Sequence, residues 1–578
     1  MSKVFEYMKP YTHFMIIAVV LLTIEANMAL ILPGYMADII NEGVLPGMIH
    51  IIWHNGLRML VVTLISVVCA LAMAYFAARI ATGVANDLRA AVFKKVVHFS
   101  NAEINRFSTS SLITRTTNDI TQIQTTLMMS LRLLIYAPIL GVGGIIRAME
   151  RDVSMSWIVA IATVAMVGTM TILFLIALPK FKIVQSLIDR LNLVSRENLS
   201  GILIVRAFST QAFEKKRFDK ANKDLADTNR FVDQIFAFMT PIIMLIMNVT
   251  TAVIVFVGAR QASAFRVDVG DIFAFLQYGM LVIFAFLMVA MMFVLLPRAV
   301  VSAGRVKEVL TTESNLKYND NPIKLKDFSG TVEFRDVSFK YPDAKEDDDN
   351  VLSHVSFTAR PGQTTAFIGS TGSGKSTIFK LLLRFYDVTG GGIFFDGINV
   401  KDIHKESLHN QIGYVAQKAS LFTGSIRSNL LYADKDATEE RLAYATEVAQ
   451  AADFIEEKPD GYESNVAQGG SNFSGGQRQR LSIARALVKR AQVYLFDDSF
   501  SALDLKTDAL LRAALKKRTA HATKLVIAQR VSSIMDAEQI IVLDHGEIVG
   551  IGRHFELMNS CEVYREIAAS QLSEEELR

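Results

Sequence analysis

Six long apolar runs in the first 330 residues constrain the fold of this chain more than any other feature. Each run is about 20 residues or longer, which is the length that a helix needs to cross a hydrocarbon core of ~30 Å. The sequence therefore predicts an all-α transmembrane domain over residues 1–310. Its six spans are expected at about 14–34, 57–82, 127–149, 155–179, 236–259 and 272–297.

The distribution of charge predicts how the spans are oriented. Residues 1–330 carry 31 Lys and Arg against 22 Asp and Glu, whereas residues 331–578 carry 29 against 35. The connection 41–56 has neither Lys nor Arg, while 79–132 and 180–233 are rich in both. Because cytoplasmic connections are enriched in Lys and Arg, the N-terminus and the C-terminal half are predicted to be cytosolic. Membrane topology therefore explains the basic excess, and we expect no nucleic-acid partner for this multi-pass plasma-membrane protein.

Several side chains within the spans are candidates for substrate contact. Glu25 lies midway along the first run, where a carboxylate is costly and indicates a functional site by default. The alternative is that Glu25 faces a water-filled cavity or bonds to a neighbouring helix. In the sixth run, side chains suited to a pliable apolar pocket are Phe284, Met288, Met291 and Met292, since rings and thioethers adapt to varied ligands. The alternative for each of these is ordinary packing or contact with lipid.

A phosphate-binding pattern dominates the second half of the chain. After a polar linker over 311–330, residues 331–578 alternate strand and helix patterns, as in an α/β domain. An apolar strand at 366–368 runs into Gly-x4-Gly-Lys-Ser over 369–376 and then into a helix. The glycine N–H groups and the helix N-terminus face phosphate oxygens, Lys375 neutralises phosphate charge, and the Ser376 hydroxyl can bind Mg²⁺. The predicted triphosphate contacts are Ser370, Thr371, Gly372, Ser373, Gly374, Lys375, Ser376 and Thr377.

Further motifs narrow the class of nucleotide-binding protein. Phe-Ser-Gly-Gly-Gln occupies 473–477, Val-Tyr-Leu-Phe-Asp-Asp follows at 493–498, and Ser-Ala-Leu-Asp at 501–504. With these motifs the second half resembles the ATP-binding cassette (ABC) transporters. Six spans ahead of one cassette resemble an exporter half-transporter of the multidrug or lipid type. The resemblance implies ATP and Mg²⁺ as cofactors, and alternating access driven by ATP binding and hydrolysis.

The resemblance also implies roles for single residues. Tyr341 falls where members of the family stack a ring on adenine, and Asp497 where they hold Mg²⁺. Gln417 falls where a glutamine joins Mg²⁺ to the membrane domain. The remaining expected nucleotide contacts, in the signature and D-loop motifs, are Ser474, Gly475, Gly476, Gln477 and Asp504. Residues 114–119, 197–202 and 205–208 resemble loops that carry coupling helices onto the cassettes; the alternative is solvated helix extensions.

Two residues depart from the family pattern at the expected catalytic positions. Asp498 stands where members of the family have a glutamate that polarises the attacking water. Its side chain is shorter, so its carboxylate would lie ~1.5 Å further from that water. A general base must lie within hydrogen-bond reach, so Asp498 is expected to be a poor base. Gln529 stands where a histidine is usual, and it cannot become cationic during phosphoryl transfer. Both belong to the P-loop side of the cassette, whereas the signature motif is intact.

These departures predict a heterodimer. The chain looks like the degenerate-site subunit of a bacterial heterodimeric multidrug exporter. It would bind ATP at a poorly hydrolysing site and complete the competent site of a second half-transporter that carries the usual Glu and His. The alternatives are a homodimer with two impaired sites, a transporter for a specific cargo such as a peptide or siderophore, and a regulatory, channel-like cassette protein.

Overall fold

The computed structural model describes residues 2–316, 318–319, 321–325, 328–345 and 347–572. The chain forms two compact units. One contains Met1–Val97 and Ser110–Thr312, and the other contains His98–Thr109 and Glu313–Arg578. The predicted boundary near residue 310 differs from this division at one segment, because residues 98–109 belong to the C-terminal unit.

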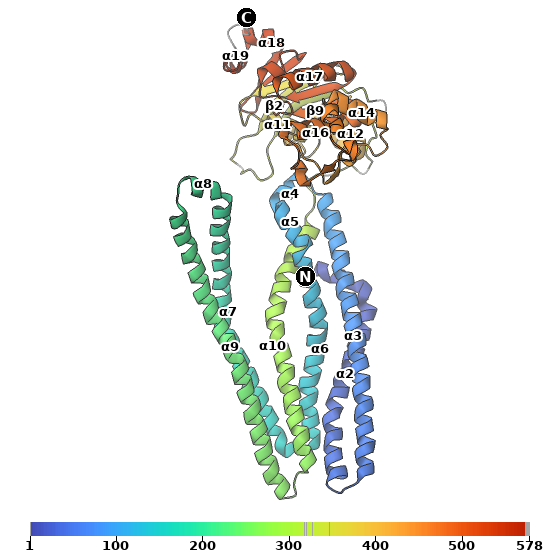
Figure 1. Ribbon diagram of the computed structural model, residues 1–578, viewed down its shortest axis with the longest axis vertical. Coiled ribbons are helices and arrows are strands. Elements are labelled where there is room, and N and C mark those ends of the chain that lie inside the picture. Colours follow the sequence, from blue (N-terminus) through green and yellow to red (C-terminus); the bar gives the residue numbers. More distant parts are fainter. Residues whose placement is uncertain (1, 317, 320, 326–327, 346, 573–578) are drawn as a thin grey trace. The chain divides into compact units, whose positions relative to one another are not determined.

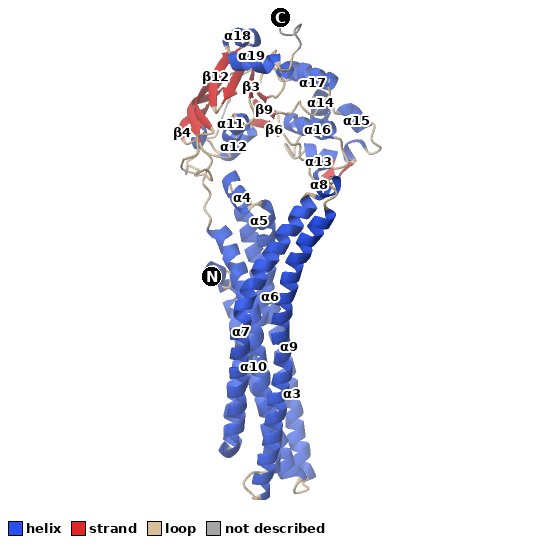
Figure 2. Cartoon of the chain, turned by 90° about the vertical axis from the view of Figure 1, so that its left-hand side faces the viewer, coloured by secondary structure: helices blue, strands red, loops and turns tan. Residues whose placement is uncertain are grey.

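The first unit consists of helices (Figures 1 and 2). Within the described residues, six helical segments are long and apolar enough to cross a membrane, which confirms the predicted all-α transmembrane domain. The main helices of these segments are α2 (Thr12–Asp38), α3 (Ile49–Val97), α6 (Asn118–Arg151), α7 (Val153–Ser200), α9 (Gln211–Ser263) and α10 (Val269–Thr311). Short elements join or precede them: α1 (Ser2–Glu6), η1 (Lys9–Tyr11), η2 (Ile39–Val44), α5 (Thr109–Thr116) and α8 (Ile202–Ala207).

Small residues and polar pairs hold the helices of the first unit together. Helices α6 and α10 lie side by side, as do α7 and α9 (Figure 1). A Cβ at Gly144 of α6 would lie 2.8 Å from Val282 of α10, so the glycine permits close approach. At another point Arg151 donates to Asp38 over 3.0 Å and to Asp271 over 3.4 Å. This triad ties α2, α6 and α10 together at the ends remote from the cytosolic connections.

Residues 114–119 pack against the last turns of α10. The Arg115 guanidinium donates to Glu308 over 2.8 Å and to the carbonyl of Arg305 over 3.0 Å. Asp119 is buried and accepts a hydrogen bond from Ser302 over 2.8 Å. The segment that resembles a coupling loop is therefore hydrogen-bonded to α10, the helix that precedes the cassette in the chain. In the other candidate loop, α8 and its flanks expose Leu199, Leu203 and Phe208.

The second unit is an α/β cassette, as predicted, and all the described strands lie in it (Figure 2). Its main sheet has the order β12-β11-β3-β10-β9-β6, and every neighbouring pair is parallel except β11 and β12. The strands are β3 (Thr364–Gly369), β6 (Ile412–Val415), β9 (Val493–Asp497), β10 (Thr523–Ile527), β11 (Gln539–Asp544) and β12 (Glu547–Gly552). β9 and β10 are buried throughout, as expected for parallel strands covered on both faces.

A second sheet and a set of helices complete the cassette. The sheet has the order β2-β1-β4-β5, formed by β1 (Val332–Phe339), β2 (Leu352–Ala359), β4 (Gly390–Phe395) and β5 (Ile398–Asn399). A short pair joins β7 (Gly424–Ser425) to β8 (Asn465–Val466). The helices are α11 (Lys375–Leu382), α12 (Lys405–Asn410), α13 (Ile426–Leu430), α14 (Glu439–Val448), α15 (Ala452–Glu456), α16 (Gly475–Val488), α17 (Leu505–Arg518), α18 (His554–Ser560) and α19 (Glu562–Ala569).

Helix α4 (Asn101–Phe107) belongs to the cassette unit. Ser100 and Glu103 cap its N-terminus reciprocally, which is a capping box. The buried Glu103 also accepts a hydrogen bond from the backbone N–H of Asn315 over 3.1 Å, and Asn105 donates to the Tyr386 hydroxyl over 3.3 Å. These contacts explain why a segment between two transmembrane helices clusters with the cassette.

Candidate nucleotide site

The phosphate-binding loop lies between β3 and α11, as the sequence predicts. Gly369 ends β3 with φ 154° and Gly374 precedes α11 with φ 92°, a region that residues with a Cβ rarely adopt. A Cβ at Gly369 would lie 1.9 Å from the Leu543 carbonyl oxygen. The tip of the loop, Thr371 and Gly372, is exposed. The loop therefore has the strand–turn–helix geometry that places a helix N-terminus beside a bound phosphate.

Lys375 lies across this loop. Its ammonium donates to the carbonyl oxygens of Gly369 over 2.8 Å and Ser370 over 2.7 Å, and to the Ser373 hydroxyl over 3.3 Å. Burial lowers the pKa of Lys375, while the charges of Asp498 and Asp497 act in the opposite direction. A partly buried cation that bonds mainly to neutral carbonyls is suited to receive a polyanion, because phosphate oxygens would supply the missing negative charge.

Ser376 and Asp497 come together although they are 121 residues apart. The Ser376 hydroxyl donates to Asp497 over 3.2 Å, at the end of the buried strand β9. Burial raises the pKa of Asp497, the hydrogen bond from Ser376 opposes this, and the charge of Asp498 adds to it. A hydroxyl and a buried carboxylate at hydrogen-bond distance fit the oxygen ligands that Mg²⁺ takes.

Asp498 and Gln529, the two departures from the family pattern, are hydrogen-bonded to each other. The Gln529 amide donates to Asp498 Oδ2 over 2.7 Å, and the Gln417 amide donates to the same oxygen over 3.3 Å. Asp498 is buried and has a φ of 46°. Gln417, expected near the metal, thus contacts Asp498 through its amide nitrogen. One carboxylate oxygen is consequently shared by two neutral amides.

Tyr341 is fixed to the helix that follows the loop. Its hydroxyl lies 3.0 Å from the Thr377 hydroxyl and accepts a hydrogen bond from Lys380 over 3.2 Å, and its ring packs edge-on against Tyr386 at 5.2 Å. Lys380 was not among the residues predicted from the sequence. The signal for it was a lysine one turn after Ser376 in an otherwise apolar part of α11.

The signature serine and the D-loop aspartate both cap helices. Ser474 accepts a hydrogen bond from the Gln477 backbone over 3.2 Å at the start of α16, and Asp504 accepts one from Thr507 over 2.9 Å at the start of α17. The hydrogen bonds from Thr507 lower the pKa of Asp504. A Cβ at Gly475 would meet open space. In the part of the chain that the structure describes, no hydrogen bond joins Ser474 or Asp504 to the phosphate-binding loop.

Glu25 of the first unit is paired with a neighbouring helix. Arg132 of α6 donates to Glu25 Oε1 over 3.1 Å, and the exposed fraction is 4% for the Glu25 side chain but 46% for Arg132. This geometry corresponds to the alternative in which Glu25 bonds to a neighbouring helix. Among the described residues, Glu25 Oε2 has no hydrogen-bond partner.

A cavity of about 630 Å³ lies between α2, α9 and α10. Of the residues predicted from the sixth span, Phe284 lines it and Met288, Met291 and Met292 do not. Met292 is buried and Met291 is 56% exposed. The lining that the sequence analysis missed includes Thr240, Met244, Met247, Gln277 and Met280. Their spacing of three or four residues was the signal, since it places them on one face of each helix.

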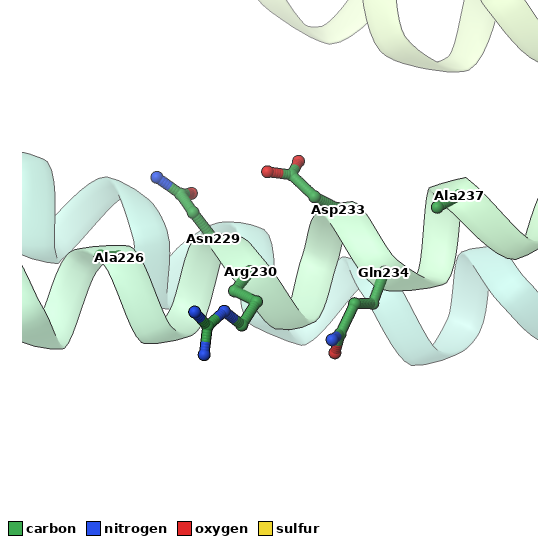
Figure 3. A pocket seen from close by; sticks show the side chains of 6 residues that line it. All are labelled: Ala226, Asn229, Arg230, Asp233, Gln234 and Ala237. Carbon is green, nitrogen blue, oxygen red and sulfur yellow. The ribbon is translucent and has the colours of Figure 1, made fainter.

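A second hollow, of about 400 Å³, lies along the cytosolic part of α9. Asn229 and Asp233 project from one side of the helix there, and Arg230 and Gln234 from the other (Figure 3). None of the predicted site residues lines it. The ATP-site motifs and the apolar cavity therefore remain the features that bear on function.

Comparisons with known proteins decide the family. Residues 352–501 match the family model described as ABC transporter, and residues 15–287 match that of the ABC transporter transmembrane region. An uncharacterized ABC transporter ATP-binding protein of Mycobacterium tuberculosis is 40% identical over 570 residues, covering 98% of this chain and 97% of that protein. This chain belongs to the ABC transporter family.

Other relatives of this ABC transporter include YfiB of Bacillus subtilis, 36% identical over 100% of this chain and 99% of YfiB. The ATP-dependent lipid A-core flippase of Pseudomonas aeruginosa is 31% identical over 87% of this chain and 82% of its own length. A solved bacterial Atm1-family ABC exporter with ATP bound has the same fold, with a TM-score of 0.78 at 24% identity, over 97% of this chain and 99% of the exporter.

The chain is thus an ABC exporter half-transporter, with one transmembrane domain and one cassette. It is a multi-pass membrane protein whose ATP-binding domain is cytosolic, as the charge distribution predicts. Its enzymatic activity is ATP hydrolysis coupled to transport across the membrane.

Proposed function

We propose that this ABC transporter is one subunit of a heterodimeric exporter that moves hydrophobic drugs or lipids. Its own phosphate-binding loop holds ATP and Mg²⁺ with slow turnover, and its signature motif, Ser474 to Gln477, completes the competent site of a different half-transporter. The observation that carries the proposal is the 2.7 Å hydrogen bond between Gln529 and Asp498. It occupies the carboxylate that stands in the position of the general base.

The chemistry of slow turnover follows from two properties of Asp498 and one of Gln529. The Asp498 side chain is one methylene shorter than glutamate, so its oxygens lie further from an attacking water. Its Oδ2 already accepts hydrogen bonds from the amides of Gln529 and Gln417. One of these amides must move away before Oδ2 can accept a proton from that side. Gln529 is neutral at every pH, so it adds no positive charge against the charge of the transferring phosphoryl group.

Nucleotide binding does not need these catalytic residues. Lys375 and the loop N–H groups bind phosphate oxygens, and Ser376 with Asp497 would hold Mg²⁺, which supplies charge neutralisation when it is bound. Tyr341 offers an aromatic ring beside α11 for the base. A site that keeps these groups and lacks a strong general base is suited to retain ATP between turnovers of the partner's site.

The proposed substrate class rests on the cavity between α2, α9 and α10. Its lining is largely apolar and includes three thioethers, Met244, Met247 and Met280, which adapt to ligands of different shape. Thr240 and Gln277 add hydrogen-bonding groups. The relatives named as lipid A-core flippases support a lipid among the candidates.

The heterodimer proposal predicts that the purified chain alone hydrolyses ATP slowly in lipid nanodiscs. Asp498→Asn is expected to change this slow rate by less than about twofold, because Asp498 contributes little as a base. The rate is measured by phosphate release, with Lys375→Ala defining the background. Rapid hydrolysis by a homodimer that Asp498→Asn abolishes would contradict the proposal.

Filling the cavity is expected to block the substrate. Met280→Trp places a bulky ring in the cavity and should weaken binding of a hydrophobic fluorescent dye by at least about tenfold, since such pockets enclose most of their ligand. Met291→Trp on the same helix is the matched control, because Met291 is exposed and does not line the cavity. Equal effects of the two substitutions on dye binding would place the substrate elsewhere.

A further inference from the structure

The side chain of Gln571 holds the backbone of the loop that carries Gln529. This loop, residues 528–530, follows β10. The Gln571 Nε2 donates to the carbonyl oxygen of Gln529 over 2.9 Å, and the backbone N–H of Val531 donates to Gln571 Oε1 over 2.8 Å. The two hydrogen bonds flank Arg530. They also fix the orientation of the amide, because a backbone carbonyl only accepts and a backbone N–H only donates.

Gln571 is presented by the packed end of the cassette. It lies two residues beyond α19, in which Tyr564 and Ala568 are buried. The Tyr564 hydroxyl lies 2.7 Å from His554 Nδ1, and Leu572 packs against the hydrophobic core of the cassette. The Gln571 side chain itself is exposed. Removal of its amide therefore leaves the core contacts on both sides in place.

The loop that Gln571 holds has two contacts with the nucleotide site. The Gln529 amide reaches Asp498, and the Arg530 guanidinium reaches the carbonyl of Ser501 in the D-loop over 3.4 Å. Both contacts start from a backbone that Gln571 fixes immediately before and after Arg530. A shift of this backbone would therefore move both side chains together.

We propose that Gln571 is a positioning residue for the ATP site, which sets the loop 528–530 so that Gln529 meets Asp498 and the terminal phosphate. The inference goes beyond the heterodimer proposal, because it concerns the geometry of this chain's own site whatever its partner is. It makes the end of α19 part of the nucleotide-sensing machinery. Since ADP lacks the terminal phosphate, Gln571 should contribute to the affinity for ATP and not to the affinity for ADP.

Gln571→Met tests the proposal, because methionine keeps the length of the side chain and removes both hydrogen bonds. We expect the preference of the full-length chain for ATP over ADP to fall about three- to tenfold, the factor that a net hydrogen bond is worth. The affinity for ADP should be unchanged. Ser570→Ala is the matched control, since the Ser570 hydroxyl donates to the Ile567 carbonyl of α19. A general loss of stability would instead weaken the binding of both ATP and ADP.

A double-mutant cycle separates positioning from an independent effect. Gln529→Ala should lower the ATP preference by itself, and Gln571→Met should add little to it, because Gln571 acts through Gln529. Hydrogen exchange gives a second measurement: the Val531 amide should exchange faster in Gln571→Met and not in Ser570→Ala. An unchanged ATP-to-ADP ratio, independent effects of the two substitutions, or unchanged exchange at Val531 would each overturn the proposal. Rapid turnover by a homodimer would contradict the heterodimer proposal and leave this result standing.

Discussion

Lys375→Ala is expected to weaken ATP binding by this chain about 100-fold, because hydrogen bonds from an ammonium to a polyanion are among the strongest in proteins. Among the residues that the structure describes, the ammonium donates to two carbonyls and a hydroxyl. A bound phosphate chain would provide full negative charge at a group whose pKa is lowered by burial. The purified chain is titrated with Mg-ATP, and binding is monitored by calorimetry or by the fluorescence of a nucleotide analogue.

The control for Lys375→Ala is Lys516→Ala, which removes a lysine of the same charge in the last turn of α17. This variant should bind ATP as the original chain does. Replacement of Lys375 by arginine is a second comparison, because it keeps the charge but changes the shape of the group in a tight loop. An ATP affinity that survives Lys375→Ala would contradict the assignment of the loop between β3 and α11 as the phosphate site.

The sequence predicts those parts of the site that are local in the chain. The phosphate-binding loop is one continuous stretch of strand, glycine-rich turn and helix, so residues 364–382 are sufficient to predict its geometry. The position of Asp498 beside Gln529 is different, because it depends on β9 and β10 being neighbours in the sheet. Strand order is a long-range property, and no local pattern predicts the hydrogen bond between these two side chains.

The membrane domain shows the same limit in another form. The six spans follow from length and hydropathy alone. However, the apolar residues of α2 and α10 are not gathered on one face, so the sequence does not indicate which face packs and which lines a cavity. The residues predicted from the sixth span were Phe284, Met288, Met291 and Met292, of which Phe284 lines the cavity. Met244 and Met247 of the fifth span line it as well and were not among the predicted residues.

Helix α4 belongs to a unit that composition does not predict for it. A division at residue 310 follows the change from apolar to polar composition. The contacts of Glu103 with Asn315 and of Asn105 with Tyr386 join segments more than 200 residues apart. Composition carries no information on such contacts.

Restoring the usual residues at both departures should convert this site into a hydrolysing one. In the two-chain complex, with the partner's phosphate-binding lysine replaced by alanine, Asp498→Glu together with Gln529→His is expected to raise ATP hydrolysis about 10- to 100-fold, since general base catalysis contributes at least this much. The longer carboxylate reaches further toward the water, and histidine supplies a group that can carry positive charge. Phosphate release by the complex measures the change.

Each single substitution should do much less, because Asp498 and Gln529 are hydrogen-bonded partners. With Asp498→Glu alone, the amides of Gln529 and Gln417 remain available to bind the new carboxylate, and with Gln529→His alone the carboxylate is still short. The φ of 46° at residue 498 also favours aspartate over glutamate, so a modest loss of thermal stability should accompany the gain in rate. Asp498→Asn with Gln529→His is the control that lacks a base. If the restored pair hydrolyses ATP no faster than this control, a feature other than these two residues limits the site.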